Sequence, residues 1–278
     1  MKKVLLSSVV LLSVVAAANV AAAADGGVYT SQGAITFTPS TGKTDPEDPN
    51  KPGEPVGPEI DPEEWPEGPK EPPVGTDGPL SIDFASFFYF GEQEITTQSK
   101  VYDTGVQKYV KKVNDKGEWV EDPEAKATEG PNYVQVTDNR GTEAGWTLKV
   151  KQDKQFTSKN NHVLSGATVG FKNGHVVTAS KSAKPTSTGI FTLDFDGTNE
   201  GGSAESIVME AKAGQGGGTY LNNFGTWNDT EATPGIFEGT AKKSVQLSVP
   251  GSTTKYAERY TTDFVWTLSD VVSTTPEV

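Results

Sequence analysis

From residue 80 onward the sequence repeats one pattern: short stretches in which apolar and polar residues alternate, separated by Gly, Asn and Asp. A period of two places every second side chain on the same face of a β-strand. No stretch shows the 3.6-residue period of an amphipathic helix. The sequence therefore predicts an all-β fold, an antiparallel β-sandwich or barrel-like single domain. The predicted strands are residues 80–84, 133–137, 146–150, 167–171, 190–195, 206–209, 244–249 and 260–268.

Three short segments have the composition of hairpin turns, because they combine Asn or Asp with Gly, the residues that tolerate positive φ. They are residues 115–117, 138–141 and 173–174. The first lies between residues 109–113 and 118–121, two strand-like stretches rich in Lys and Glu. Here the sequence predicts a charged hairpin with a possible partner of its own.

Residues 44–79 have a different composition, dominated by Asp, Glu, Pro and Gly, and hold eleven of the eighteen prolines. Proline removes backbone hydrogen-bond donors, and repulsion between carboxylates extends a chain. We therefore expect a disordered acidic Pro-rich insertion, semi-extended and mostly solvated.

One alternating stretch precedes this segment, with Ile35 and Phe37 on one face. A single strand is not stable by itself, so we expect it to pair with the sheet formed after residue 79. Residues 25–43 would then supply an N-terminal strand, residues 80–278 the main body, and residues 44–79 an insertion within one domain.

The first 24 residues have the composition of a secretory signal peptide. Lys2 and Lys3 precede an apolar run over residues 4–18, which is followed by small residues with two overlapping Ala-x-Ala sites. The run of about 15 residues is shorter than the roughly 20 that span a bilayer. We therefore expect cleavage near Ala24 and a secreted protein without a membrane insertion.

The rest of the sequence offers no permanent anchor. It has no second hydrophobic segment, and residues 273–278 lack a sorting pentapeptide of the LPxTG kind. It also has zero cysteines, so the fold must depend on its core, which the remaining 278 − 24 = 254 residues can provide. Retention at the cell surface would have to be non-covalent.

The charge balance argues against nucleic acid as a partner. Removal of Lys2 and Lys3 leaves 24 − 2 = 22 basic residues against 37 acidic ones, a net charge of −15. Binding to phosphates requires a basic face.

No catalytic or metal-binding motif stands out, so we expect a non-catalytic protein without a cofactor or metal. His162 and His175 lie in Asn-rich turn contexts and have no ligand partner at metal-site spacing. Residues 194–200 suit a hard cation chemically but miss the EF-hand spacing, and an Asp/Gly/Asn turn is favoured there. A secreted glycan hydrolase remains an alternative, because 37 acids offer many carboxylate pairs.

Two identical Trp-Thr-Leu triplets are the most specific feature. They place Trp146 with Leu148, and Trp266 with Leu268, on one face of a strand each. Two roles are open for these four residues. They either pack the core, or leave an indole as a platform on which a sugar ring can stack.

Around these triplets the sequence resembles the small WxL-domain proteins of Gram-positive bacteria. The segments that carry the resemblance are residues 33–37, 134–148, 214–218, 224–225, 245–251 and 260–270. The resemblance implies a cell-surface protein attached non-covalently to the cell wall by peptidoglycan binding. Trp146, Leu148, Trp266 and Leu268 would then contact the glycan or pack the fold that does.

The resemblance also implies possible partners: other WxL proteins, a membrane-anchored protein and host extracellular matrix. The alternative function is therefore a surface assembly or adhesion component that docks a protein partner and contacts the wall indirectly.

Overall fold

The computed structural model describes residues 29–115, 118–195, 202–227 and 239–271. The chain divides into two units, residues 1–37 and 38–278. The second unit contains both the acidic segment and the strands after residue 80. The predicted signal peptide, residues 1–24, lies outside the described residues.

In the first unit, the described residues 29–37 form no strand or helix, and Ile35 and Phe37 are 77% and 85% exposed. The strand predicted over residues 34–38 is therefore absent from this structure. Two apolar side chains on an isolated strand bury nothing, so no local force holds the segment in a β conformation.

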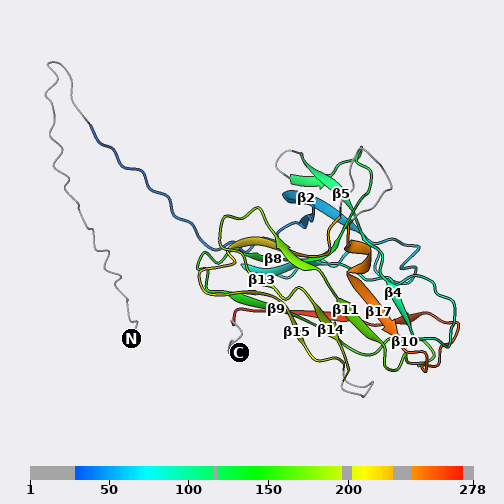
Figure 1. The fold of residues 1–278 in the computed structure, drawn as a ribbon. Helices are drawn as coiled ribbons and strands as arrows, with labels where there is room; N and C mark the ends of the chain where they lie inside the picture. Colours follow the sequence, from blue (N-terminus) through cyan, green and yellow to red (C-terminus); the bar gives the residue numbers. More distant parts are fainter. Residues whose placement is uncertain (1–28, 116–117, 196–201, 228–238, 272–278) are drawn as a thin grey trace, which may run out of the picture. The chain divides into compact units, whose positions relative to one another are not determined.

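The second unit is all-β, with antiparallel pairing throughout its described strands (Figure 1). Three four-stranded sheets surround the core, and none closes into a barrel. The first, here called the β8 sheet, has the order β12 (Gly174–Val177), β16 (Gly218–Phe224), β8 (Asn132–Asp138) and β3 (Leu80–Ala85). The β9 sheet has the order β13 (Thr186–Ser187), β15 (Ser206–Ala211), β9 (Trp146–Gln152) and β19 (Phe264–Ser269).

The β11 sheet has the order β14 (Phe191–Leu193), β11 (Thr168–Phe171), β17 (Val245–Val249) and β4 (Lys100–Asp103). A smaller β5 sheet joins β1 (Glu47–Asp48), β2 (Lys51–Glu59), β5 (Gln107–Asp115), β6 (Glu118–Glu121) and β7 (Thr128–Gly130). Strands β10 (Thr157–Ser158) and β18 (Tyr260–Thr261) pair separately, and a single 3₁₀ turn spans Ala241–Lys243. Among the described residues no helix is long and apolar enough to cross a membrane.

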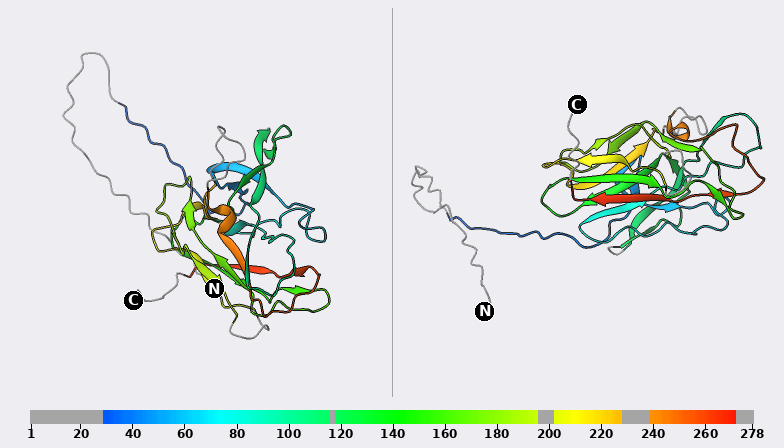
Figure 2. Two further views of the ribbon diagram at one scale, coloured as in Figure 1. Left: turned by 45° about the vertical axis from the view of Figure 1, so that its right-hand side comes forward. Right: turned by 90° about the horizontal axis from the view of Figure 1, so that it is seen from below.

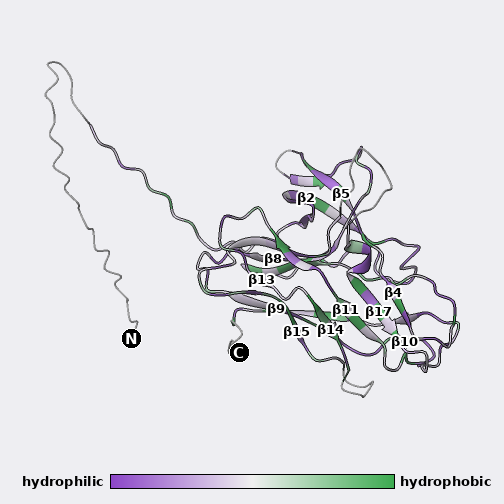
Figure 3. Cartoon of the chain, in the orientation of Figure 1, coloured by the Kyte–Doolittle hydropathy of each residue, from purple (hydrophilic) through white to green (hydrophobic). Residues whose placement is uncertain are grey.

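The three larger sheets meet in one hydrophobic core. Phe171 lies at its centre, with its ring centroid 4.7 Å from that of Phe191, 5.0 Å from Phe224 and 5.4 Å from Phe88. In Figure 3, β17 alternates between hydrophobic and hydrophilic residues, as expected of a strand with one buried face, whereas most loops and much of β5 are hydrophilic. The predicted sandwich is confirmed, and each predicted strand overlaps an observed one.

One of the three predicted hairpins forms, and the other two do not. Residues Asp115 and Glu118 pair across the β5–β6 hairpin, which confirms the charged hairpin. The other two predicted hairpins are wrong, because residues 138–141 join β8 to β9 and residues 173–174 join β11 to β12, strands of different sheets. Asn173 and Gly141 do have positive φ, of 54° and 71°. A sharp turn leaves open which sheet the next strand joins, because core packing decides that.

The acidic segment is not disordered over residues 47–59, where β1 and β2 form. Its backbone is fastened to side chains on the outer face of the β8 sheet. Gln135 accepts a hydrogen bond from Glu47 N (2.7 Å) and donates one to Asp45 O (3.0 Å). Asn223 donates to Pro49 O (2.8 Å). These bonds replace water for the segment's backbone and explain why proline-rich sequence is ordered here.

A buried tyrosine completes this attachment. Tyr109 of β5 is fully buried, donates to Asp48 (2.8 Å) and accepts from Asn50 (3.1 Å). The segment and the β5 sheet thus cover the outer face of β8, and all seven residues of β8 are buried.

Candidate functional site

The two Trp-Thr-Leu triplets lie on neighbouring strands. Strands β9 and β19 pair in antiparallel fashion with Leu148 opposite Leu268 and Val150 opposite Trp266. Both triplets therefore turn their Trp and Leu to the same, inward face of the β9 sheet. Two segments about 120 residues apart in the sequence form one structural unit.

The first triplet belongs to the core. Trp146 and Leu148 are 0% exposed. The indole N–H of Trp146 donates to Gly216 O (3.1 Å), and its ring lies 6.3 Å from that of Tyr220. A Cβ at Gly216, where φ is 80°, would come within 2.6 Å of the indole nitrogen. The glycine-rich stretch thus leaves room for the tryptophan, and neither Trp146 nor Leu148 has surface to offer a ligand in this structure.

The second triplet packs against the same core but is only half-buried, because β19 is the edge strand of its sheet. Trp266 and Leu268 keep some surface on their inward face. A binding role for any of the four triplet residues stays a prediction.

The structure brings together another aromatic group that sequence reasoning missed. Half-buried Trp65 meets the ring of Phe87 edge-on at 5.6 Å and that of Tyr89 at 6.3 Å. The guanidinium of exposed Arg259 lies 5.2 Å from the Trp65 ring centroid and 5.6 Å from that of Tyr89. We call these four residues the Trp65 cluster. The only hint of it in the sequence is Trp65 itself, a large aromatic residue inside an acidic Pro-rich segment whose composition predicts exposure to solvent.

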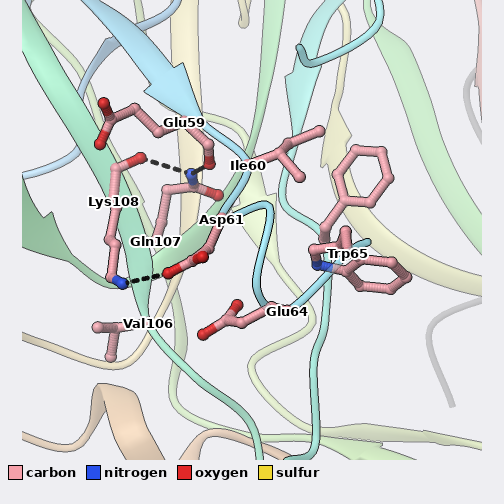
Figure 4. Close-up of a pocket in the computed structure, with 9 residues that line it drawn as sticks. Glu59, Ile60, Asp61, Glu64, Trp65, Val106, Gln107 and Lys108 are labelled. Carbon is pink, nitrogen blue, oxygen red and sulfur yellow. Dashed lines mark hydrogen bonds and ion pairs between the residues drawn. The ribbon is translucent and has the colours of Figure 1, made fainter. Parts of the chain in front are cut away.

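A small pocket adjoins the Trp65 cluster (Figure 4). Its volume is about 20 Å³, room for roughly one water molecule. Lys108 and Asp61 form an ion pair of 2.8 Å on one side of it, and Gln107 donates to Glu59 O (3.0 Å) and Lys108 O (2.7 Å). A sugar ring cannot enter this pocket, so a larger ligand would have to lie on the rim that carries Trp65.

Glu64 supplies an acceptor at this rim. Its carboxylate is half-buried and accepts no hydrogen bond from any residue that the structure describes. Burial raises the pKa of Glu64 and nearby Lys108 partly offsets this, whereas the hydrogen bond from Lys108 lowers the pKa of Asp61. Arg259 is oriented by donating to Glu64 O (2.6 Å). An aromatic ring, a guanidinium and an open carboxylate suit stacking and hydrogen bonding.

The histidines have local partners. His162 lies 3.0 Å from the Glu258 carboxylate and stacks on Tyr256 at 3.8 Å, while His175 approaches Asn173 O at 3.1 Å. Among the described residues, no group of three or more His, Cys, Asp or Glu could hold a metal ion. The cation candidate at residues 194–200 falls largely outside the described residues.

Comparison with known proteins gives one clear result. Searches of curated proteins and of solved structures return no match. Over residues 24–271, however, the chain matches the WxL domain family, described as a surface cell wall-binding domain. The match takes in both triplets and the cluster around Trp65. This chain therefore belongs to the WxL family and is a cell wall-binding protein of the cell surface.

Proposed function

We propose that this non-catalytic protein is held at the wall by direct, non-covalent binding of peptidoglycan, and that the Trp65 cluster contacts the glycan. Membership of a wall-binding family supplies the class of ligand. The single observation that carries the proposal is the half-buried Trp65 with the Arg259 guanidinium over its ring.

The chemistry of peptidoglycan suits this surface. Its glycan consists of amino-sugar rings whose apolar faces can stack on an indole, and whose hydroxyl and acetamido groups both donate and accept hydrogen bonds. Arg259 is a donor over the Trp65 ring, and the Glu64 carboxylate is an acceptor in the adjoining pocket. Trp146 and Leu148 then serve binding indirectly by holding the fold, while the surface left on Trp266 and Leu268 is a second possible contact.

Charge does not favour long-range attraction. The whole chain carries a net charge of −13, and walls that contain teichoic acids are anionic. Binding must therefore come from short-range contacts, which salt screens little.

Sedimentation with purified cell walls tests the proposal. We expect Trp65→Ala to weaken binding about tenfold, equivalent to about 1.4 kcal/mol, because the stacking surface is lost. Trp119→Ala is the matched control, since Trp119 is 46% exposed on the β5–β6 hairpin. Binding of the unchanged protein should vary little with salt. A folded Trp65→Ala variant that sediments like the unchanged protein would refute the proposed contact.

A second function, assembly with a membrane-anchored partner or host matrix protein, has one observation in its favour. The β5–β6 hairpin exposes the opposed pair Val113 and Val120 (39% and 40%) and Trp119. Tryptophan is favoured at protein interfaces. Capture of such a partner that Trp119→Ala abolishes, without sedimentation on bare walls, would favour this function over direct wall binding.

A further inference from the structure

One flank of the sandwich is closed and the other is open. The edge strands β12 and β13 lie in contact, so their sheets meet along one side. The opposite edges of the same sheets are β3 and β19, seen in the right-hand view of Figure 2 as the cyan and red strands. Trp266 and Leu268 on β19 are only half-buried there, whereas Trp146 and Leu148 on the adjacent strand are fully buried. The core is thus incompletely covered along β19.

The two edges of this open flank differ in their backbone. Residue Ile82 of β3 is already bonded on its outer side, because Thr76 N donates to Ile82 O (2.8 Å) and Thr76 Oγ1 accepts from Ile82 N (2.9 Å). Strand β19 pairs with β9 alone, and no other strand among the described residues joins it. A further strand can therefore add at β19 and not at β3.

The sequence of β19 does nothing to block such an addition. Edge strands are usually protected by charged residues or proline. Strand β19 reads Phe-Val-Trp-Thr-Leu-Ser and contains neither, whereas the edge strand β4 reads Lys-Val-Tyr-Asp. The β19 edge is therefore less protected against strand addition than the β4 edge.

The chain also contains an unused strand-like segment. Residues 34–38 alternate apolar and polar residues, and Ile35 and Phe37 have the same two-residue spacing as Trp266 and Leu268. Both side chains are largely exposed in unit 1. The WxL match nevertheless begins at residue 24, so this segment belongs to the family's domain although residues 34–37 fall in unit 1.

We propose that residues 34–38 of one copy add as an extra strand to the β19 edge of a second copy, with Ile35 and Phe37 covering Trp266 and Leu268. Among the described residues, 34–38 form no strand and β19 pairs only with β9, and joining the two between copies gives both a partner. Because the contact joins different surfaces, it repeats from copy to copy and builds a linear assembly at the cell surface. This self-assembly is independent of the Trp65 cluster.

Disulfide trapping tests the contact, because the chain has no cysteine of its own. Thr36 lies between Ile35 and Phe37, and Thr267 between Trp266 and Leu268, so both threonines face away from the core. Two mature chains that begin at Asp25 are prepared, one with Thr36→Cys and the other with Thr267→Cys. One of them carries a larger tag, and the two are mixed and oxidised. The control acceptor carries Val101→Cys, on the exposed face of the β4 edge. We expect roughly tenfold more mixed dimer with Thr267→Cys as the acceptor than with Val101→Cys.

Adding Ile35→Ser and Phe37→Ser to the Thr36→Cys chain should remove the mixed dimer, since these changes leave the folded unit untouched. Equal trapping at Thr267→Cys and Val101→Cys would overturn the proposal. So would a chain carrying both Thr36→Cys and Thr267→Cys that closes the disulfide within a single monomer.

Discussion

At the scale of single residues, Trp146 shows how a family-defining side chain can matter without touching a ligand. Its ring is fully enclosed and its N–H is bonded to Gly216 O. An indole buried in this way supplies a large area of apolar contact and needs the hydrogen bond it has. Trp146 therefore fixes how the glycine-rich stretch lies against β9.

Replacing Trp146 by Ala should strongly destabilise the domain, by about 3 to 5 kcal/mol in the free energy of unfolding, because it opens a large cavity. Denaturant unfolding measures this. Trp119→Ala should change the same quantity by less than about 0.5 kcal/mol, as at most surface sites. Comparable stability of the two variants would contradict the burial of Trp146.

Glu258 should give a distinct signature at low pH. Hydrogen bonds from Ser158, Asn160 and His162 lower its pKa to about 2, from an ordinary value of 4.5. A depressed carboxyl pKa means that the folded state releases this proton more readily than the unfolded state. Its contribution to stability is thus present above pH 4.5 and is lost as the pH falls toward 2.

Titration of side-chain carboxyl carbons by NMR checks this pKa directly. Glu258→Gln should also flatten the acid dependence of stability within that window. A titration midpoint near 4.5 for Glu258 would show that the three hydrogen bonds do not form in solution.

At the scale of elements, the acidic Pro-rich segment is the main departure from what composition predicts. Its order depends on partners far away in the sequence, chiefly Gln135 and Asn223 on the β8 sheet and Tyr109 on β5. Composition indicates how a segment behaves in water, but it contains no information about the side chains that bind the segment once the rest of the domain has folded. The segment is therefore a cover for the outer face of β8.

Gln135→Ala should loosen this cover selectively. The change removes hydrogen bonds to Glu47 N and Asp45 O and leaves buried polar groups unpaired, which costs about 1 to 3 kcal/mol. We expect faster amide hydrogen exchange over residues 45–59 with little change in β9. Gln246→Ala, which removes an exposed hydrogen bond to Asp103, is the matched control and should leave that exchange unchanged.

The elements that the sequence predicted well are those whose signal is local. Alternation located strands such as β8, β9 and β17, since burial of one face requires it. Pairing is not local. Nothing in the residues around Trp146 and Trp266 indicates that Leu148 faces Leu268, and nothing in residues 138–141 shows that the next strand joins another sheet.

The candidate site could not be predicted from local sequence patterns for the same reason. Trp65, Tyr89 and Arg259 come from three distant parts of the chain, and the first lies in a segment whose composition indicates solvent exposure. By contrast, the triplets were easy to find because they repeat, and their burial could not be read from the repeat itself.

At the scale of the whole molecule, the residues that define the WxL motifs and the residues proposed to bind lie in different parts of the domain. The triplets share the inward face of one sheet, while other aromatic groups lie elsewhere, half-buried at the Trp65 cluster and exposed on the β5–β6 hairpin. An acidic protein that belongs to a wall-binding family needs such short-range surfaces, because its charge does not draw it to an anionic wall. We therefore propose that Trp65 is the tryptophan that contacts the glycan.

Indole N–H signals in an NMR titration with soluble peptidoglycan fragments decide this, since the chain has only five tryptophans. Single Trp→Phe variants assign the signals. We expect the Trp65 signal to shift and saturate while those of Trp146 and Trp119 stay in place. A shift confined to Trp146 or Trp266, with Trp65 unmoved, would contradict the account.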